Sequence, residues 1–237
     1  MLLSAGYLGI VSYEVALALQ ERLVELRWRD VIGDTLLLLE HPHVFTLGRG
    51  AQESDLLSVP SSVPVYRVSR GGQATYHGPG QLVGYPIIKL EERSRDVHAY
   101  LRSLEEAIIC SLQRYGIAGV RRKGFTGVWV GERKIAFIGV GIRRWVTMHG
   151  FAVNVCPDLS YFRAIVPCGI RECEITSMAC ETEHASISTA ELAEVVCGEF
   201  ARVFHYDAYA PLCTEALAVL SELNSSSPTE SFEQWTK

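Results

Sequence analysis

The sequence has no excess of basic residues: its 237 residues include 22 Lys and Arg against 27 Asp and Glu, a net charge of -5. Proteins that bind nucleic acids usually carry surplus positive charge, so we expect no nucleic-acid partner. No Cys-x-x-Cys pair occurs among the seven cysteines, and their number is odd, which argues against a zinc ribbon and a disulfide framework. Reduced thiols favour a cytoplasmic protein.

Segments that direct a chain to or through a membrane are also missing. Residues 1–12 place no Lys or Arg before their apolar residues, and amphipathic sequence follows at once, which is not the layout of a signal peptide. The charge-free run at residues 71–88 holds too much glycine, proline and polar side chain for a bilayer-spanning helix. We therefore expect a protein that is neither exported nor embedded in a membrane.

The length and the apolar content favour a single domain. Hydrophobic residues make up 48% of the chain, which is enough to fill a sizeable core. We assign residues 1–220 to this domain. A Ser-Ser-Ser-Pro sequence at residues 225–228 marks a C-terminal tail, residues 221–237, that we expect to be disordered.

Three helices are predicted from caps and from apolar residues at helical spacing. The first spans residues 12–29 with Ser12 as its N-cap. The second spans residues 96–116, with Asp96 as N-cap and a glycine at its end. The third opens at residue 188 or 189 and continues through residue 200.

Apolar runs predict the strands. The run at residues 36–39 is continuous, which is typical of a strand buried on both faces. Further runs lie at residues 63–68, 82–88, 126–130, 135–142 and 146–155, and residues 50–64 form a surface connection. The last three runs follow one another closely, which favours an antiparallel meander. The fold class is α+β, with a mixed, largely antiparallel sheet packed with helices.

The segment at residues 70–81, Arg-Gly-Gly-Gln-Ala-Thr-Tyr-His-Gly-Pro-Gly-Gln, is the most unusual stretch of the chain. Its four glycines permit backbone angles closed to other residues and let a ligand approach the main chain, and its proline stiffens the loop. Apolar runs on both sides attach it to a sheet edge. A glycine-rich turn without a ligand is the alternative, but the interleaved arginine, threonine, tyrosine and histidine favour a binding site.

Cys168 has a setting unlike that of the other cysteines, between Pro167 and Gly169. This setting is typical of an exposed nucleophile, although a single cysteine more often has a structural role. A thiol with a pKa of about 8.5 is largely protonated at neutral pH and needs a nearby cation to react. Lys134 is a candidate because it enters an apolar strand, and an exposed strand end beside Arg133 is the alternative interpretation.

Four separated blocks of the sequence together resemble the lipoyl(octanoyl) transferases of lipoate biosynthesis. They are residues 70–81, residues 134–139 (Lys-Ile-Ala-Phe-Ile-Gly), residues 149–154 (His-Gly-Phe-Ala-Val-Asn) and residues 167–169 (Pro-Cys-Gly). The blocks occur in the order and spacing of that family, and the resemblance covers roughly residues 5–210. Their combination is far more specific than any single glycine motif.

The resemblance implies the α+β fold of biotin and lipoate protein ligases and an acyltransferase activity. Such an enzyme takes an octanoyl group from octanoyl-acyl carrier protein. It transfers the group to a lysine of a lipoyl domain, in the E2 subunits of 2-oxoacid dehydrogenases or in the glycine-cleavage H protein. By position, Cys168 forms the acyl-thioester, and Lys134 lowers the pKa of Cys168 and then shuttles protons. No cofactor, ATP or metal is implied, and we expect a monomer.

The resemblance also implies a substrate pocket built from three of the blocks. Its residues are Arg70, Gly71, Gly72, Gln73, Ala74, Thr75, Tyr76, His77, Phe137, Ile138, Gly139, Gly150, Phe151 and Ala152. Ala74 stands where the family pattern has a larger branched residue, and Phe137 stands where it has a small one. These departures bear on the shape of the pocket and hence on the preferred acyl chain length.

Other functions and roles stay open. One alternative is an ATP-dependent lipoate or biotin protein ligase on the same fold, which has no need of Cys168; another is a non-catalytic module that binds lipoyl domains. His41 and His43 are weak evidence for a metal site without further ligands, and we assign them structural roles. The basic groups at residues 121–123 and 143–144 are either solvated charge or a patch that steers an acidic carrier protein.

Overall fold

The computed structural model describes residues 1–90, 95–166, 173–182 and 187–225. Its helices are α1 (Tyr13–Trp28), α2 (Val97–Gln113), α3 (Met178–Glu181), α4 (Thr189–Val203) and α5 (Thr214–Ser225), with 3-10 turns at Glu53–Asp55 and Leu159–Ala164. Its strands are β1 (Leu2–Ile10), β2 (Thr35–Glu40), β3 (Val44–Leu47), β4 (Val65–Arg67), β5 (Ala74–His77), β6 (Gln81–Ile87), β7 (Val120–Arg122), β8 (Phe125–Val130), β9 (Arg133–Arg143), β10 (Val146–Asn154) and β11 (Ala208–Ala210).

Two sheets contain the strands of the described residues. The larger sheet has the order β11-β1-β2-β6-β10-β9-β8-β7, and the smaller has the order β4-β3-β5. In the larger sheet β1 runs parallel to both of its neighbours, whereas the other pairs are antiparallel. This arrangement confirms the expected α+β class with a mixed, largely antiparallel sheet, and the meander β8-β9-β10 is confirmed with it.

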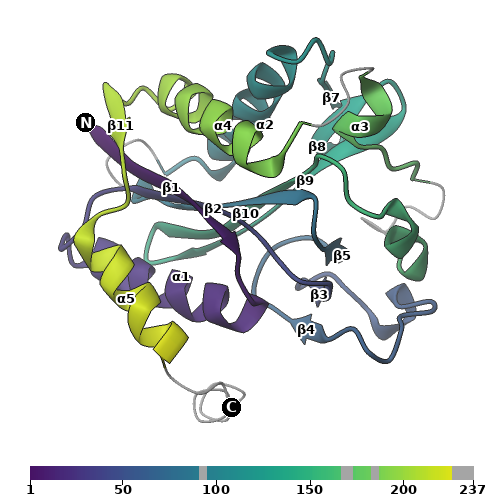
Figure 1. Cartoon of the computed structure of the whole chain (residues 1–237), viewed down its shortest axis with the longest axis horizontal. Coiled ribbons are helices and arrows are strands. Elements are labelled where there is room, and N and C mark those ends of the chain that lie inside the picture. The colour runs from purple at the N-terminus through teal and green to yellow at the C-terminus, as the bar shows by residue number, and fades with distance from the viewer. Residues whose placement is uncertain (91–94, 167–172, 183–186, 226–237) are drawn as a thin grey trace.

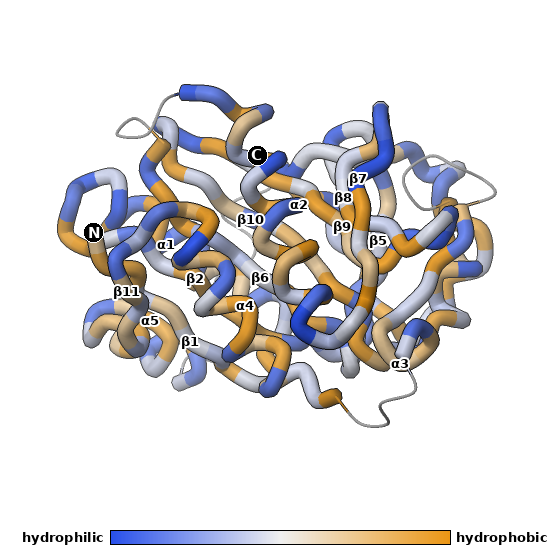
Figure 2. The backbone as a smooth tube through the Cα atoms, turned by 90° about the horizontal axis from the view of Figure 1, so that it is seen from above, coloured by the Kyte–Doolittle hydropathy of each residue, from blue (hydrophilic) through white to orange (hydrophobic). Residues whose placement is uncertain are grey.

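Helices cover both faces of the larger sheet, and the smaller sheet lies beside one end of it (Figure 1). α2 and α4 pack against each other on one face, while α1 and α5 lie together on the other face. All six residues of β2 are buried, because Leu36 and Leu38 face one helix layer and Leu37 and Leu39 face the other. Along α4 hydrophobic and hydrophilic segments alternate (Figure 2), as a helix covering a sheet requires.

The helices begin at the predicted caps. The side chains of Ser12, Asp96 and Ser188 each accept a hydrogen bond from a backbone N–H in the first turn of α1, α2 and α4. Such bonds satisfy backbone donors that have no partner inside the helix. After α2 the chain reaches Gly116 at a φ of 75°, a conformation that favours glycine and that stops the helix as expected.

Four stretches differ from the prediction. Residues 2–10 form β1, which was not predicted, and β4 is shorter than the apolar run at residues 63–68. The segment at residues 70–81 is not a continuous loop, since β5 lies inside it. Residues 221–225, expected to be disordered, belong to α5. The rest of the expected tail, residues 226–237, lies outside the described residues. No helix of the described part of the chain has the length and apolar character to cross a bilayer.

Candidate active site

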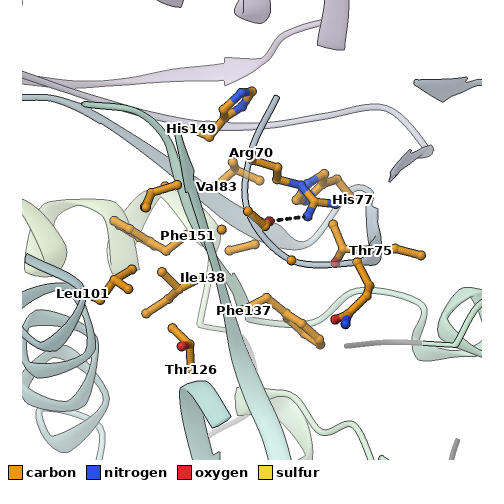
Figure 3. Close-up of a pocket in the computed structure, with 18 of the residues that line it drawn as sticks. Arg70, Thr75, His77, Val83, Leu101, Thr126, Phe137, Ile138, His149 and Phe151 are labelled. Atoms are coloured by element: carbon orange, nitrogen blue, oxygen red, sulfur yellow. Dashed lines mark hydrogen bonds between the residues drawn. The ribbon is translucent and has the colours of Figure 1, made fainter. Parts of the chain in front are cut away.

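The candidate site lies at an edge of β9 that β8 leaves uncovered. The pairing of β8 with β9 reaches Ala136, and further along β9 the glycine-rich segment takes over, because Gly71 N donates a hydrogen bond to Val140 O (2.9 Å). A cavity of about 520 Å³ opens at this edge (Figure 3). The free edge of a central strand therefore becomes one wall of a pocket.

Most of the residues expected at the substrate pocket line this cavity. They are Arg70, Gly71, Gly72, Gln73, Ala74, Thr75, His77, Phe137, Ile138, Gly139, Gly150, Phe151 and Ala152. Lys134 lines the same cavity, as does His149. Folding thus brings three of the four sequence blocks to one place, although they lie on different strands.

The cavity has an apolar side and a polar side. In Figure 3 Leu101 of α2, Ile138 of β9 and Phe151 of β10 gather on one side, and Arg70 and His77 lie on the other. An alkyl chain would be buried against the first group, whereas groups that form hydrogen bonds would face the second. This polarity suits a ligand with a long apolar part and a polar reactive end.

Tyr76 is the exception among the expected pocket residues, because it does not line this cavity. Side chains alternate along β5, so Tyr76 points away from the cavity and packs on Phe45 and Tyr161. Its hydroxyl forms a hydrogen bond with Nδ1 of His43 (2.7 Å). A side chain at Gly78 would collide with this tyrosine, since a Cβ there would lie 2.0 Å from the Tyr76 hydroxyl. His43 borders a separate cavity, not the site.

Arg70 fastens the glycine-rich segment to the smaller sheet. Its guanidinium donates hydrogen bonds to the Thr46 carbonyl (2.8 Å), to the Thr46 hydroxyl (2.7 Å) and to the Gly71 carbonyl (3.0 Å). Gly48 must lack a side chain for this contact, because a Cβ there would lie 2.4 Å from the Gly72 carbonyl oxygen. The buried guanidinium of Arg70 therefore holds the pocket wall in place through hydrogen bonds to groups of the protein itself.

Two buried histidines face the cavity in their neutral form. Burial lowers the pKa of His77 to about 3, and burial together with the Arg70 charge lowers the pKa of His149 to about 3. Nδ1 of His77 donates a hydrogen bond to Oε1 of Gln81 (2.6 Å), because the Gln81 amide group donates to Asn154 and to the Tyr76 carbonyl. Nε2 of His77 is then the acceptor nitrogen.

His41 has a structural role, as the sequence predicted. One ring nitrogen lies 2.7 Å from the Val11 carbonyl and the other lies 2.7 Å from the Tyr85 hydroxyl. Burial lowers the pKa of His41 to about 4, so the ring is neutral. Both nitrogens are occupied, and no group of three or more His, Cys, Asp or Glu in the described part of the chain is arranged to hold a metal ion.

Lys134 is buried in the cavity wall, so the interpretation as an exposed strand end is wrong. Its exposed fraction is 2%, and Nζ donates a hydrogen bond to the Thr126 carbonyl (3.0 Å). Gly127 leaves room for the lysine side chain, because a Cβ there would lie 2.6 Å from Cε of Lys134. The nearby aromatic rings of Trp129 and Phe137 also contact the amine.

Cys168 lies outside the described residues, so its distance from Lys134 is not part of this structure. The described residues before and after it are held by backbone hydrogen bonds. Val166 N donates a hydrogen bond to the Asp55 carbonyl (2.8 Å), and Lys134 N donates one to the Glu174 carbonyl (2.8 Å). Among the other cysteines, burial raises the pKa of Cys197 to about 12, as expected for a structural thiol.

Several residues at the site were not predicted from the sequence. Val97 and Leu101 of α2 line the cavity, as do Tyr13 of α1 and Tyr85 of β6. Glu105 of α2 accepts a hydrogen bond from Gly127 N (3.0 Å). This contact helps to shape β8, the strand beside Lys134. Glu105 follows Leu101 by four residues, so it shares the apolar face of the helix, and a glutamate at such a position is the sequence signal that could have indicated this role.

The expected basic patches are largely paired. Arg121 forms ion pairs with Glu105 and Glu106, Arg122 pairs with Glu132, and Arg144 pairs with Glu25. These pairs compensate part of the positive charge of the two groups. Steering of an acidic carrier protein by these groups stays a prediction.

Comparison with solved structures defines the class of fold. A lipoate-protein ligase A bound with ATP superposes with a TM-score of 0.75 at 18% identity, over 95% of this chain and 96% of that chain. A bi-partite lipoate protein ligase from Thermoplasma acidophilum superposes with a TM-score of 0.69 at 18% identity, over 96% and 95% of the two chains. These likenesses establish the lipoate protein ligase fold, as expected.

Sequence comparison then identifies the family. Residues 12–201 match the lipoyl protein ligase A/B catalytic domain, and the chain belongs to that family. Octanoyltransferase from Solibacter usitatus is 51% identical over 205 residues, which cover 84% of this chain and 92% of that protein. Octanoyltransferase from Gloeobacter violaceus is 49% identical over 199 residues, which cover 83% and 87%.

Proposed function

We propose that this protein is an octanoyltransferase that acylates lipoyl domains. It takes an octanoyl group from octanoyl-acyl carrier protein and transfers it to a lysine of a lipoyl domain in 2-oxoacid dehydrogenases or the glycine-cleavage H protein. Relatives with about half of their residues identical carry the name octanoyltransferase. The observation that supports the chemistry best is an amine, that of Lys134, buried in the wall of a cavity with an apolar side.

In the first half-reaction the thiolate of Cys168 attacks the thioester carbonyl carbon of the donor. The bond from that carbon to the carrier sulfur breaks, and the octanoyl group passes to Sγ of Cys168. The carrier thiolate leaves with a proton from Lys134, which becomes a neutral amine. One thioester replaces another, so the acyl group stays activated and no ATP is consumed.

In the second half-reaction the neutral amine of the acceptor lysine attacks the carbonyl carbon of the acylated Cys168. The amide bond forms, the bond to Sγ breaks, and the proton of the attacking nitrogen passes to Lys134. Thiolate and protonated lysine are restored together. The same amine therefore gives up a proton in one step and recovers it in the next.

Binding of the acyl chain uses the apolar side of the cavity. Its volume of about 520 Å³ lies in the range of small-molecule sites. Contacts with Leu101, Ile138 and Phe151 remove the chain from water. Burying about seven methylenes at about 0.8 kcal/mol each stabilises the bound donor by about 6 kcal/mol.

An acyl-transfer assay separates this function from its alternatives. The purified protein is incubated with a lipoyl domain and either octanoyl-acyl carrier protein alone or free octanoate with ATP, and lysine acylation is followed by mass. We expect acylation with the carrier protein and none with octanoate and ATP. The reverse pattern would identify an ATP-dependent ligase, and no acylation under either condition would favour a non-catalytic module.

Two variants test the assigned thiol. Cys168→Ala should lower the transfer rate to less than about a thousandth, because the covalent path is lost. Cys156→Ser is the matched control, since Cys156 is an exposed cysteine that lies outside the cavity. Its rate should equal that of the unchanged protein. Equal losses in both variants would remove Cys168 from the mechanism.

A further inference from the structure

The buried amine of Lys134 lies against the faces of two aromatic rings. Nζ is 5.3 Å from the ring centroid of Trp129 and 5.0 Å from that of Phe137. Both rings are nearly inaccessible, with exposed fractions of 1% for Trp129 and 6% for Phe137. A cation this close to an aromatic face is attracted by the ring quadrupole, and the attraction grows when water is excluded.

Strand register places Trp129 beside the lysine. Trp129 of β8 is the partner of Lys134 of β9, next to a shift of register between Val128 and Trp129. Gly127, at a φ of 129°, lies at this irregularity and leaves the lysine side chain room to reach the Thr126 carbonyl. The irregular strand β8 thus supplies the ring of Trp129, the Thr126 carbonyl as hydrogen-bond acceptor and, at Gly127, the space for the lysine side chain.

Phe137 completes the contact from the lysine's own strand. Its ring stacks on Phe162 with a centroid distance of 5.1 Å and an interplanar angle of 10°. Phe162 in turn packs edge-on against Tyr76 at 5.3 Å. The Phe137 ring is therefore fixed from behind, so its free face is presented to the amine.

The indole of Trp129 is held by its faces, not by its N–H. Nε1 of Trp129 is buried and has no hydrogen-bond partner among the described residues. The guanidinium of Arg122 lies over the same ring at 5.1 Å. An unpaired buried N–H carries a cost, so the favourable contacts of this ring are those of its faces.

We infer that Trp129 and Phe137 are positioning residues, which hold the charged amine of Lys134 in the cavity wall through the faces of their rings. The inference rests on the proposed function, in which Lys134 lowers the pKa of Cys168. Without the rings the amine keeps its hydrogen bond to the Thr126 carbonyl but loses the attraction of the two ring faces. The thiolate of Cys168 is then less favoured, and proton transfer to and from Lys134 slows.

The pH dependence of thiol alkylation measures this effect. Iodoacetamide modification of Cys168 is followed by peptide mass in the unchanged protein and in variants, across pH 5 to 10. Trp129→Leu and Phe137→Leu should each raise the midpoint of the profile by at least about 0.5 pH unit, toward that of Lys134→Ala. Trp129→Phe restores an aromatic face and should return the midpoint to within about 0.2 unit. Midpoints of both leucine variants equal to that of the unchanged protein would overturn the inference.

A fluorination series keeps the shape of the core and so avoids misfolding. In a Trp28→Phe, Trp145→Phe, Trp235→Phe background, Trp129 is replaced by tryptophan with one to four ring fluorines, which progressively weaken the negative ring face. The alkylation midpoint should rise with each fluorine, and a flat series would overturn the inference. Arg122→Gln is the control, because it removes the other cation over this ring and should leave the midpoint unchanged.

Failure of the inference differs from failure of the proposed function. If Lys134→Ala raises the midpoint but the fluorinated proteins do not, the lysine acts as proposed and the rings do not hold it. If Lys134→Ala itself leaves the midpoint unchanged, the assigned role of the lysine is wrong. Both outcomes contradict the inference, and only the second contradicts the proposed function.

Discussion

Replacing Arg70 by lysine keeps the positive charge at the pocket but removes the planar fork of donors. The guanidinium binds the Thr46 carbonyl, the Thr46 hydroxyl and the Gly71 carbonyl, and Arg70 is buried. A lysine amine cannot span β3 and the Gly71 carbonyl together. Losing two charge-assisted hydrogen bonds at about 1.5 kcal/mol each lowers the free energy of unfolding by about 3 kcal/mol. For a chain of this size the Tm should fall by about 6 to 12 °C.

The same substitution should slow acyl transfer, because the segment at residues 70–73 forms a wall of the cavity. We expect kcat/KM to fall at least tenfold, as displacement of a binding wall misplaces the reacting carbonyl. Circular dichroism gives the Tm, and transfer kinetics give kcat/KM. Thr46→Val is the matched control: it removes the hydroxyl acceptor, keeps the carbonyl and should cost about 1 kcal/mol. A Tm and a kcat/KM of Arg70→Lys equal to those of the unchanged protein would refute this reasoning.

Three further predictions follow from buried groups near the site. Burial lowers the pKa values of His41, His77 and His149 to about 4, 3 and 3, so each takes up a proton on unfolding below its ordinary value of 6.5. The free energy of unfolding from urea titrations should therefore be full above about pH 6.5 and fall toward pH 4, whereas a constant value would contradict neutral burial. Gly127→Ala should lower the rate of acyl transfer at least tenfold, because its Cβ would lie 2.6 Å from Cε of Lys134. The control is Gly131→Ala, at a φ of 57° with open space around it, which should keep the transfer rate and lower the free energy of unfolding by about 1 kcal/mol. Glu40→Gln should lower the free energy of unfolding in urea by about 1 to 3 kcal/mol. The Glu40 carboxylate accepts hydrogen bonds from Gly80 N and from the Tyr7 and Thr189 hydroxyls, and an amide would turn a donor toward one of them. Unchanged stability would show that these bonds contribute nothing.

Features of the fold with a local cause were predictable from the sequence. Ser12, Asp96 and Ser188 cap the helices that they were expected to cap, because a capping bond needs only the next few residues. The meander from residue 125 to residue 154 was predictable for the same reason, since its turns are short. Local signals of this kind specify helix starts and neighbouring strands.

Features that depend on distant pairing were not predictable. β1 is held by parallel pairing with β2 and with β11, some two hundred residues further along the chain. The pairing of β5 with β3 turns the Tyr76 side chain away from the cavity. This orientation cannot be read from the glycine-rich segment alone. Burial of Lys134 depends on the space that Gly127 leaves on another strand, beside a register shift, so the spacing of residues around the lysine left two interpretations open.

The covalent intermediate is the central claim, and intact mass after incubation with octanoyl-acyl carrier protein alone tests it most directly. We predict a gain of one octanoyl group, mapped to the peptide that contains Cys168, labile to hydroxylamine and discharged when a lipoyl domain is added. An octanoyl adduct of the same lability on Cys168→Ser, or acylation of the lipoyl domain by that variant at the unchanged rate, would contradict the account.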